Sequence, residues 1–221
     1  MKANLLTLLL TALLQTVALA LPPGYQILPN TTSPNGKLGL AFPKVTPEYN
    51  SPDADLLLVQ ISPYKVVEEI PRTFSTLTGN NASYLVTWTA DSQYLLVIEN
   101  CKWGADQVIR GEMTPGGACA TTSLTGTIKH ILTPMFAAAK APPYNNLLPY
   151  IFDSETRVTW KGDRVIKDTG WQLLPNGNVK VDCTATNDPK GISPKRWAVR
   201  FVGTYTPEFD GFENPQITPV P

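Results

Sequence analysis

Apolar and polar residues alternate with a period of two along much of this chain, which is the pattern of strands that bury one face. Turns rich in Pro, Gly, Asn and Asp separate the alternating segments. The N-terminal half therefore predicts a four-stranded sheet at 25–28, 37–42, 55–61 and 65–70, and a second sheet with strands at 84–89, 93–99 and 106–113. Where the second sheet would need a fourth strand, Gly116-Gly117 interrupts the pattern, so we expect that strand to be missing.

Apolar residues recur at intervals of three and four in the next segment, which predicts an amphipathic helix within residues 122–140 that packs on a sheet. Pro134 lies inside this segment, and an internal proline predicts a kink or a break. In the alternative arrangement Thr133 caps a second short helix that begins at Pro134. The apolar positions are Leu124, Ile128, Ile131, Leu132, Met135, Phe136 and Ala139.

The rest of the chain again follows the pattern of strands. Three further strands are predicted at 155–160, 179–184 and 196–205. Residues 206–221 contain four prolines and are expected to form a frayed tail. We therefore expect residues 21–205 to form a single β-rich domain, with the helix as an insertion.

One short turn, followed each time by an apolar strand, recurs along the sequence. Proline presets the backbone for such a turn, and Asn, Asp and Gly tolerate the conformations that close it. The three copies are Ser33-Pro34-Asn35-Gly36-Lys37 before Leu-Gly-Leu-Ala-Phe, Trp88-Thr-Ala-Asp-Ser-Gln before Tyr-Leu-Leu-Val-Ile, and Leu174-Pro-Asn-Gly-Asn before Val179.

These phrases resemble the turns between the first and second strands of blades in WD40-like and TolB-like β-propellers. The resemblance implies a mainly β fold of antiparallel sheets, with two to three blades of an incomplete propeller. The arrangement is also similar to that of secreted bacterial proteins, and it carries a fold but no mechanism. Because an incomplete propeller leaves strand edges unpaired, a homodimer that covers them is compatible with this fold.

The first twenty residues have the composition of a secretory signal peptide. Met1-Lys2 gives a positive start, residues 5–14 are apolar, and Ala18-Leu19-Ala20 has the small residues of a cleavage site. The alternative is an uncleaved membrane anchor, although the apolar stretch is short for a span. We expect a mature chain that begins near Leu21, has no membrane span, and is secreted, periplasmic or on the cell surface.

Composition narrows the classes of partner. The chain has 221 residues, 18 basic and 18 acidic residues, and 43% hydrophobic residues. Such a hydrophobic content suits a packed core rather than a disordered chain. A net charge of zero argues against a nucleic-acid partner, which requires a basic face.

An exported chain with three cysteines cannot pair all of them internally. Cys183 alternates with Val179 and Val181, so we interpret it as a core residue. Cys101 and Cys119 lie at strand ends or in loops around a Gly-rich stretch, and we predict a disulfide between them. Three free thiols are the alternative, because spacing alone never fixes pairing.

The sequence offers few catalytic candidates. It contains no Gly-x-Ser-x-Gly motif, and the single histidine, His130, is interpreted as a solvated helix residue. The histidine and the separated cysteines do not have the spacing of a zinc site, and the loop with Asn50, Asp53 and Asp55 is interpreted as solvated rather than as a calcium site. We predict no metal and no cofactor. The carboxylate pairs considered for glycoside hydrolysis are Asp153 with Glu155 and Asp163 with Asp168.

Aromatic residues are the stronger candidates for binding. Most alternate with apolar residues and are interpreted as core: Tyr84 with Trp88, Val158 with Trp160, and Trp197 with Phe201 and Tyr205. Trp103 lies in the turn Cys101-Lys102-Trp103-Gly104, where the ring either anchors a partner, beside Lys102, or folds back over the strand ends. Asn30 and Asn81 begin sequences of the N-glycosylation type.

The observations favour a secreted, non-enzymatic β-rich module that binds a protein or glycan partner or acts as a scaffold. The first alternative is an extracellular carbohydrate-active hydrolase that uses a carboxylate pair. The second is a carbohydrate-binding module that uses the exposed Trp103.

Overall fold

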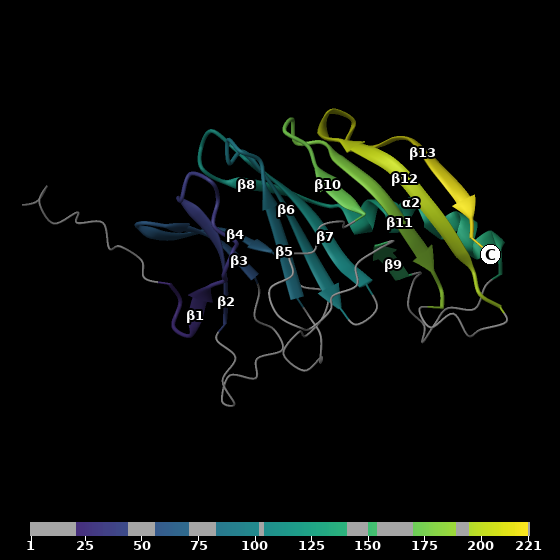
Figure 1. Ribbon diagram of the computed structural model, residues 1–221, viewed down its shortest axis with the longest axis horizontal. Helices are drawn as coiled ribbons and strands as arrows, with labels where there is room; N and C mark the ends of the chain where they lie inside the picture. Colours follow the sequence, from purple (N-terminus) through teal and green to yellow (C-terminus); the bar gives the residue numbers. More distant parts are fainter. Residues whose placement is uncertain are drawn as a thin grey trace, which may run out of the picture.

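The computed structural model describes residues 21–43, 56–70, 83–101, 104–140, 150–153, 170–188 and 195–220. The fold in these ranges is mainly β, with antiparallel sheets and one α-helix. Figure 1 shows the sheets in a row, with the N-terminal sheet at one end and the C-terminal sheet at the other. The predicted fold class is therefore confirmed.

The first sheet consists of four strands in the order of the sequence. They are β1 (Tyr25–Ile27), β2 (Leu38–Pro43), β3 (Leu56–Ile61) and β4 (Tyr64–Ile70). All of the pairings are antiparallel. The predicted four-stranded unit is confirmed.

The second sheet also has four strands, so the expected absence of its fourth strand is wrong. The strands are β5 (Ser83–Trp88), β6 (Tyr94–Cys101), β7 (Gly104–Met113) and β8 (Cys119–Ser123). The missed strand, β8, pairs with β7 after a tight turn at 114–117. Its residues are small and polar and most are exposed, so it carries no apolar alternation that a sequence pattern could detect.

The third sheet has five strands, and β9 and β10 pair with successive parts of β11. The strands are β9 (Tyr150–Asp153), β10 (Trp171–Leu173), β11 (Val179–Thr186), β12 (Ala198–Thr206) and β13 (Gly211–Pro219). The predicted strands at 179–184 and 196–205 are confirmed. The strand predicted at 155–160 lies outside the described residues.

The prediction of a frayed tail from residue 206 is wrong. A short 3-10 helix, η1 (Pro207–Phe209), turns the chain back, and β13 pairs with β12 along nearly its whole length. The sheet tolerates the two prolines of β13 because Pro215 lies in an irregular part of the pairing and Pro219 ends the strand. The C-terminal residues thus complete the third sheet.

The helix α2 (Leu124–Ala138) confirms the predicted insertion, but it continues through Pro134 without the predicted break. Ser123 is its N-cap, and the Ser123 Oγ accepts a hydrogen bond from Gly126 N at 3.2 Å. Thr133 lies inside the helix and donates its hydroxyl to Lys129 O at 2.6 Å, so it is not a cap. The structure gives no membrane-length apolar helix within the ranges it describes.

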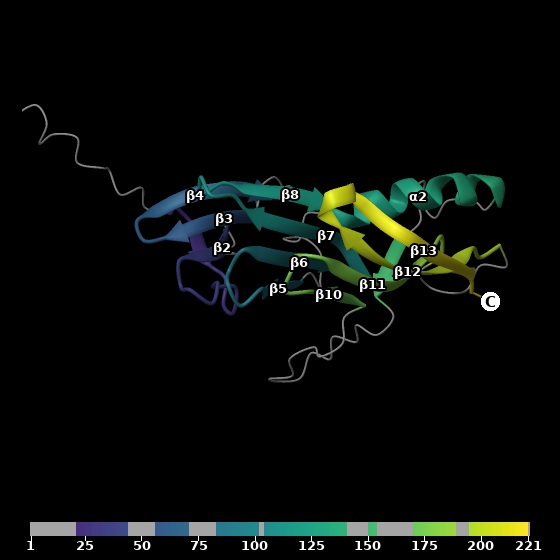
Figure 2. The ribbon, with the colours of Figure 1, turned by 90° about the horizontal axis from the view of Figure 1, so that it is seen from above.

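Two hydrophobic clusters hold the row of sheets together. One lies between the first and second sheets, and the other joins the second sheet, α2 and the third sheet. Figure 2 shows α2 beside β12 and β13. The ring of Phe136 in α2 and the ring of Trp197, which directly precedes β12, form an edge-to-face pair with centroids 5.3 Å apart. Alternate residues of β6 enter the two clusters, so the second sheet is packed on both faces.

The three recurrent turns share one local geometry, and each joins the first strand of the row β1–β4, β5–β8 or β10–β13 to the second. In each turn an amide three residues on donates to the first carbonyl at 2.8 to 2.9 Å, as in Gly36 N to Ser33 O. The donor residue is left-handed: Gly36 has φ 72°, Ser92 φ 62° and Gly177 φ 83°. The sheets are therefore blade-like, with four-stranded antiparallel order and a repeated turn at one position.

Candidate functional site

Polar contacts at the recurrent turns fix each sheet against the next. Between the first and second sheets, Trp88 Nε1 donates to Thr31 O at 2.9 Å, and Asn35 N donates to Ser92 Oγ at 3.1 Å. Between the second and third sheets, Arg110 Nε donates to Gly177 O at 2.7 Å. The turns thus act as joints between sheets.

The outward face of the third sheet is the candidate binding surface. A shallow concavity of about 550 Å³ lies on it, lined by residues of four strands. Apart from Val202, the outward side chains that line it are polar, whereas those on the opposite face of the same strands enter the hydrophobic cluster. The lining residues are Gly170, Gln172, Lys180, Val181, Asp182, Val202, Gly203, Thr204, Glu213, Asn214 and Gln216.

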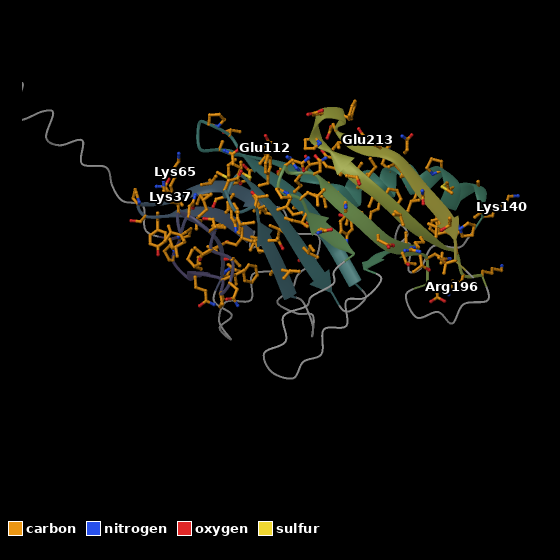
Figure 3. All side chains as sticks on the ribbon, turned by 45° about the horizontal axis from the view of Figure 1, so that its top comes forward. Lys37, Lys65, Glu112, Lys140, Arg196 and Glu213 are labelled. Atoms are coloured by element: carbon orange, nitrogen blue, oxygen red, sulfur yellow. The ribbon has the colours of Figure 1, made fainter. Side chains whose placement is uncertain are left out.

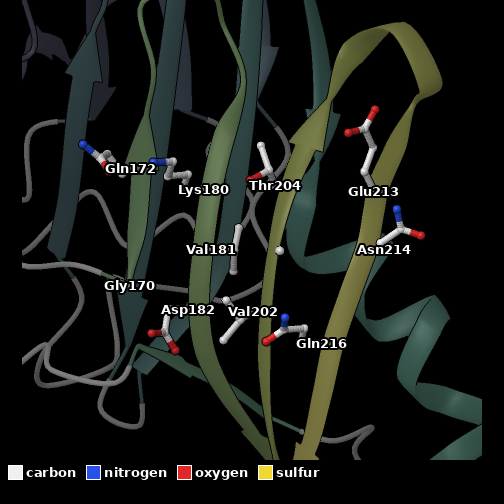
Figure 4. Close-up of a pocket in the computed structure, with 11 residues that line it drawn as sticks. Gly170, Gln172, Lys180, Val181, Asp182, Val202, Thr204, Glu213, Asn214 and Gln216 are labelled. Atoms are coloured by element: carbon white, nitrogen blue, oxygen red, sulfur yellow. The ribbon is translucent and has the colours of Figure 1, made fainter.

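Strand register arranges the polar side chains of this concavity in two rows that run across the strands. Gln172 pairs with Lys180, Lys180 with Thr204, and Thr204 with Glu213, which makes one row of four. Asp182, Val202 and Gln216 form a second row. Figure 4 shows both rows. Neighbouring strands of a sheet lie about 4.8 Å apart in general.

An irregularity in β13 shapes the edge of the concavity. Between the pairs Val202–Gln216 and Thr204–Glu213, β13 contains one more residue than β12. Asn214 in this bulge is left-handed, with φ 41°. Bulges bend a strand and change the direction of a side chain, and a left-handed residue other than glycine costs free energy. Asn214 lines the concavity at this strained position.

Aromatic rings support the concavity from beneath. Phe201 and Tyr205 are almost fully buried on the inner face of β12, and the Phe212 ring lies edge-to-face on both, with centroids 5.0 and 5.6 Å away. Tyr205 donates its hydroxyl to Asp210 Oδ1 at 2.8 Å, and burial raises the pKa of this tyrosine. The two rows of the concavity therefore lie over a layer of packed aromatic side chains.

The charges of this face compensate one another. Arg200 donates two hydrogen bonds to Asp182, from Nε at 2.8 Å and from Nη2 at 2.6 Å. These bonds hold the pKa of the Asp182 carboxyl below its ordinary value. In the described ranges no carboxylate lies within ion-pair distance of Lys180. With Glu213 included, the face has two positive and two negative side chains.

The predicted pair Cys101–Cys119 is wrong. Cys101 pairs with Gly104 at one end of the second sheet, and Cys119 pairs with Met113 at the other end. The register separates them by about eight residues along the strands, on the order of 25 Å, whereas a disulfide requires Cα atoms within about 7 Å. Cys119 is a buried free thiol, and burial raises its pKa to about 11. Cys183 lies in the core as predicted, with no exposed surface.

The structure places some other predicted residues and leaves several untested. His130 is exposed on α2, as expected, and Asn30 is exposed in the turn after β1. The backbone of Asp153 lies in β9. Outside the described residues lie residues 1–20, where a signal peptide is predicted, together with Asn50, Asp53, Asp55, Asn81, Lys102, Trp103, Glu155, Val158, Trp160, Asp163 and Asp168.

No pattern in the sequence reveals the concavity. The alternation of Val179 and Val181 with Lys180 and Asp182 predicts one polar face, but many solvated strands have this pattern. The rows arise from the register of strands distant in sequence, and the bulge at Asn214 lies where a frayed tail was expected. In the described part of the chain, no group of three His, Cys, Asp or Glu side chains could hold a metal ion.

Comparison of the chain with protein families, with curated proteins and with solved structures found no match. The fold and the site therefore rest on this structure alone.

Proposed function

We propose that this protein is an exported, non-enzymatic binding module and that the outward face of the third sheet is its binding surface. The observation that carries the proposal is the concavity of about 550 Å³ lined by hydrogen-bonding side chains from four strands. A further blade packed on this sheet would require apolar residues here, as between the first and second sheets. Lys180, Asp182 and Gln216 are instead suited to a polar ligand.

The location and ancestry of the module are part of the same proposal. The signal-like residues 1–20 support export to the periplasm, the cell surface or the medium. The four-stranded order and the repeated turn support a relationship to the blades of WD40-like or TolB-like propellers. A homodimer stays a prediction, and light scattering at high protein concentration tests it.

Affinity electrophoresis tests the proposed function. The mature protein is run through native gels that contain one soluble polysaccharide each, beside the variant Lys180→Ala/Glu213→Ala/Gln216→Ala. A matched control, Lys129→Ala/His130→Ala, removes polar groups from α2 instead. We expect at least one polysaccharide to retain the wild type and the control but not the triple variant.

Two results would contradict this function. One is retention that the triple variant keeps, because the ligand then binds elsewhere. The other is release of product from chromogenic glycosides by the purified protein, because the carbohydrate-active hydrolase would then be the better description.

A further inference from the structure

We infer that the ligand is an uncharged, hydroxyl-rich glycan chain that lies across the strands of the third sheet, over the two rows of the concavity. This inference rests on the proposed function and specifies the class of ligand. Four properties of the face support it: its shape, the order of its hydrogen-bonding groups, its charge balance and its lack of apolar anchors.

The shape suits a chain laid on a surface. The concavity is shallow and extends over β10 to β13. The row from Gln172 to Glu213 spans three strand-to-strand steps, about 14 Å in all. A pyranose unit is about as long as one such step, so the row offers one polar side chain to each of about three or four units.

The order of the groups suits hydroxyls, which both donate and accept hydrogen bonds. Along the first row an amide, an ammonium group, a hydroxyl and a carboxylate follow one another: Gln172, Lys180, Thr204 and Glu213. In the second row, the amide of Gln216 lies across from the carboxylate of Asp182, with Val202 between them. Each sugar hydroxyl would therefore find a donor or an acceptor on either side.

Charge balance argues for an uncharged chain. Lys180 and Glu213 stand in the same row on either side of Thr204, so a polyanion would meet the carboxylate and a polycation would meet the ammonium group. Asp182 and Arg200 neutralise each other through two hydrogen bonds. A glycan without charged groups meets neither repulsion.

A protein partner suits this face less well. Protein interfaces depend on a few aromatic, Arg or apolar residues buried at their centre. No aromatic residue lines the concavity, and Val202 is the apolar side chain that the rows place among the polar ones. Figure 3 shows Glu213 of β13 in the C-terminal sheet, far from Lys37 and Lys65 of the first sheet.

Isothermal titration calorimetry tests the inference, with neutral oligosaccharides of two to six units cut from the polysaccharide that retains the protein. We expect affinity to rise with length up to about three or four units and then to level off. Changing the salt concentration from 50 to 500 mM should alter the affinity less than about twofold, because counterion release is absent. Polygalacturonate and heparin serve as anionic probes.

Variants localise the effect to the rows. Thr204→Val keeps the shape of the side chain but removes its hydroxyl, and we expect the affinity for the oligosaccharide to fall about fivefold to tenfold. We expect a loss of the same size for Gln216→Ala. Thr218→Val is the matched control, because Thr218 lies on the same face outside the concavity. It should bind like the wild type. Circular dichroism shows whether each variant is folded.

The results separate this inference from the proposed function. Two results would overturn the glycan inference and leave the proposed function standing. One is a preference for polygalacturonate or heparin with steep salt dependence. The other is a protein ligand whose binding needs Thr204 and Gln216. Equal binding by Thr204→Val, Gln216→Ala and the wild type would overturn both.

Discussion

The central strands of the second and third sheets have the same length but meet different surroundings. Both β6 and β11 have eight residues. In β6 the run Leu95 to Ile98 is wholly buried, with alternate residues entering two clusters. In β11 the buried residues Val179 and Val181 alternate with Lys180 and Asp182 on the outward face. A strand's pattern thus reports how many layers pack on its sheet, and β11 has the pattern of a sheet at the end of a row.

The largest effect is expected from truncation in the doubly packed sheet. Ile98 is 1% exposed in the cluster between the second and third sheets. Ile98→Ala should lower the free energy of unfolding by about 2–5 kcal/mol, because it removes buried methyl groups and leaves a cavity. Val202→Ala on the outward face is the control and should cost less than about 1 kcal/mol. Urea unfolding measures both, and equal costs would refute the contrast between the sheets.

Two equivalent glycines of the recurrent turns test the contact between the second and third sheets. Gly177 and Gly36 occupy the same position in two copies of the turn, and both are left-handed. A Cβ at Gly177 would lie 2.6 Å from the Tyr94 ring, whereas one at Gly36 would meet nothing within 4 Å. Gly36→Ala should cost about 1 kcal/mol of backbone strain, and Gly177→Ala about 1–3 kcal/mol more.

Thermal unfolding of these two variants gives the comparison directly. A similar melting temperature for both would mean that the Tyr94 contact does not constrain the joint.

Arg110 tests the polar part of the same joint. It is 3% exposed, donates to Gly177 O and Glu112, and lies over the Tyr94 ring at 5.0 Å. Arg110→Met keeps much of the volume but leaves the Gly177 carbonyl without this donor, at a cost of about 1–3 kcal/mol. Hydrogen exchange should show faster opening around 174–178 in the variant. An unchanged exchange pattern would contradict the role of Arg110.

The smallest effect concerns pH and the outward face. The pKa of Asp182 is held below its ordinary value by Arg200, so the pair stabilises the fold above the unfolded pKa of about 4. This contribution is lost as pH falls from there through the folded pKa. Arg200→Gln should therefore differ slightly from the wild type at pH 7 and converge with it near pH 2. NMR titration of the Asp182 carboxyl in the wild type and in Arg200→Gln measures this effect. The same pKa in both proteins would refute the pairing.

Much of the fold could be predicted from sequence because local patterns encode it. The alternation in β6 and the helical spacing of Leu124, Ile128 and Leu132 predict elements that the structure confirms. Strand β8 could not be predicted, because it is a short edge strand in which Cys119 is the one buried residue and most of the others are exposed, which leaves no alternating pattern. Strand β13 could not be predicted either, because prolines are typical of irregular tails. In the structure, a bulge and the end of the strand accommodate them.

The candidate site depends on information that no local pattern contains. Lys180 and Gln216 line one concavity because β12 pairs with both β11 and β13. In the second sheet, the registers of β6 with β7 and of β7 with β8 separate Cys101 from Cys119, although the two residues are close in sequence. The register of strand pairing, rather than spacing along the chain, decides which residues line the concavity and how far apart the two cysteines lie.

The most direct test of the proposed binding surface is a map of amide chemical shifts for ¹⁵N-labelled protein of residues 21–221, titrated with neutral oligosaccharides of the proposed ligand class. We predict that the largest changes cluster at Lys180, Asp182, Val202, Thr204 and Gln216, with little change in β1 to β4. Changes confined to the first sheet or to α2, with none along β11 to β13, would contradict the account.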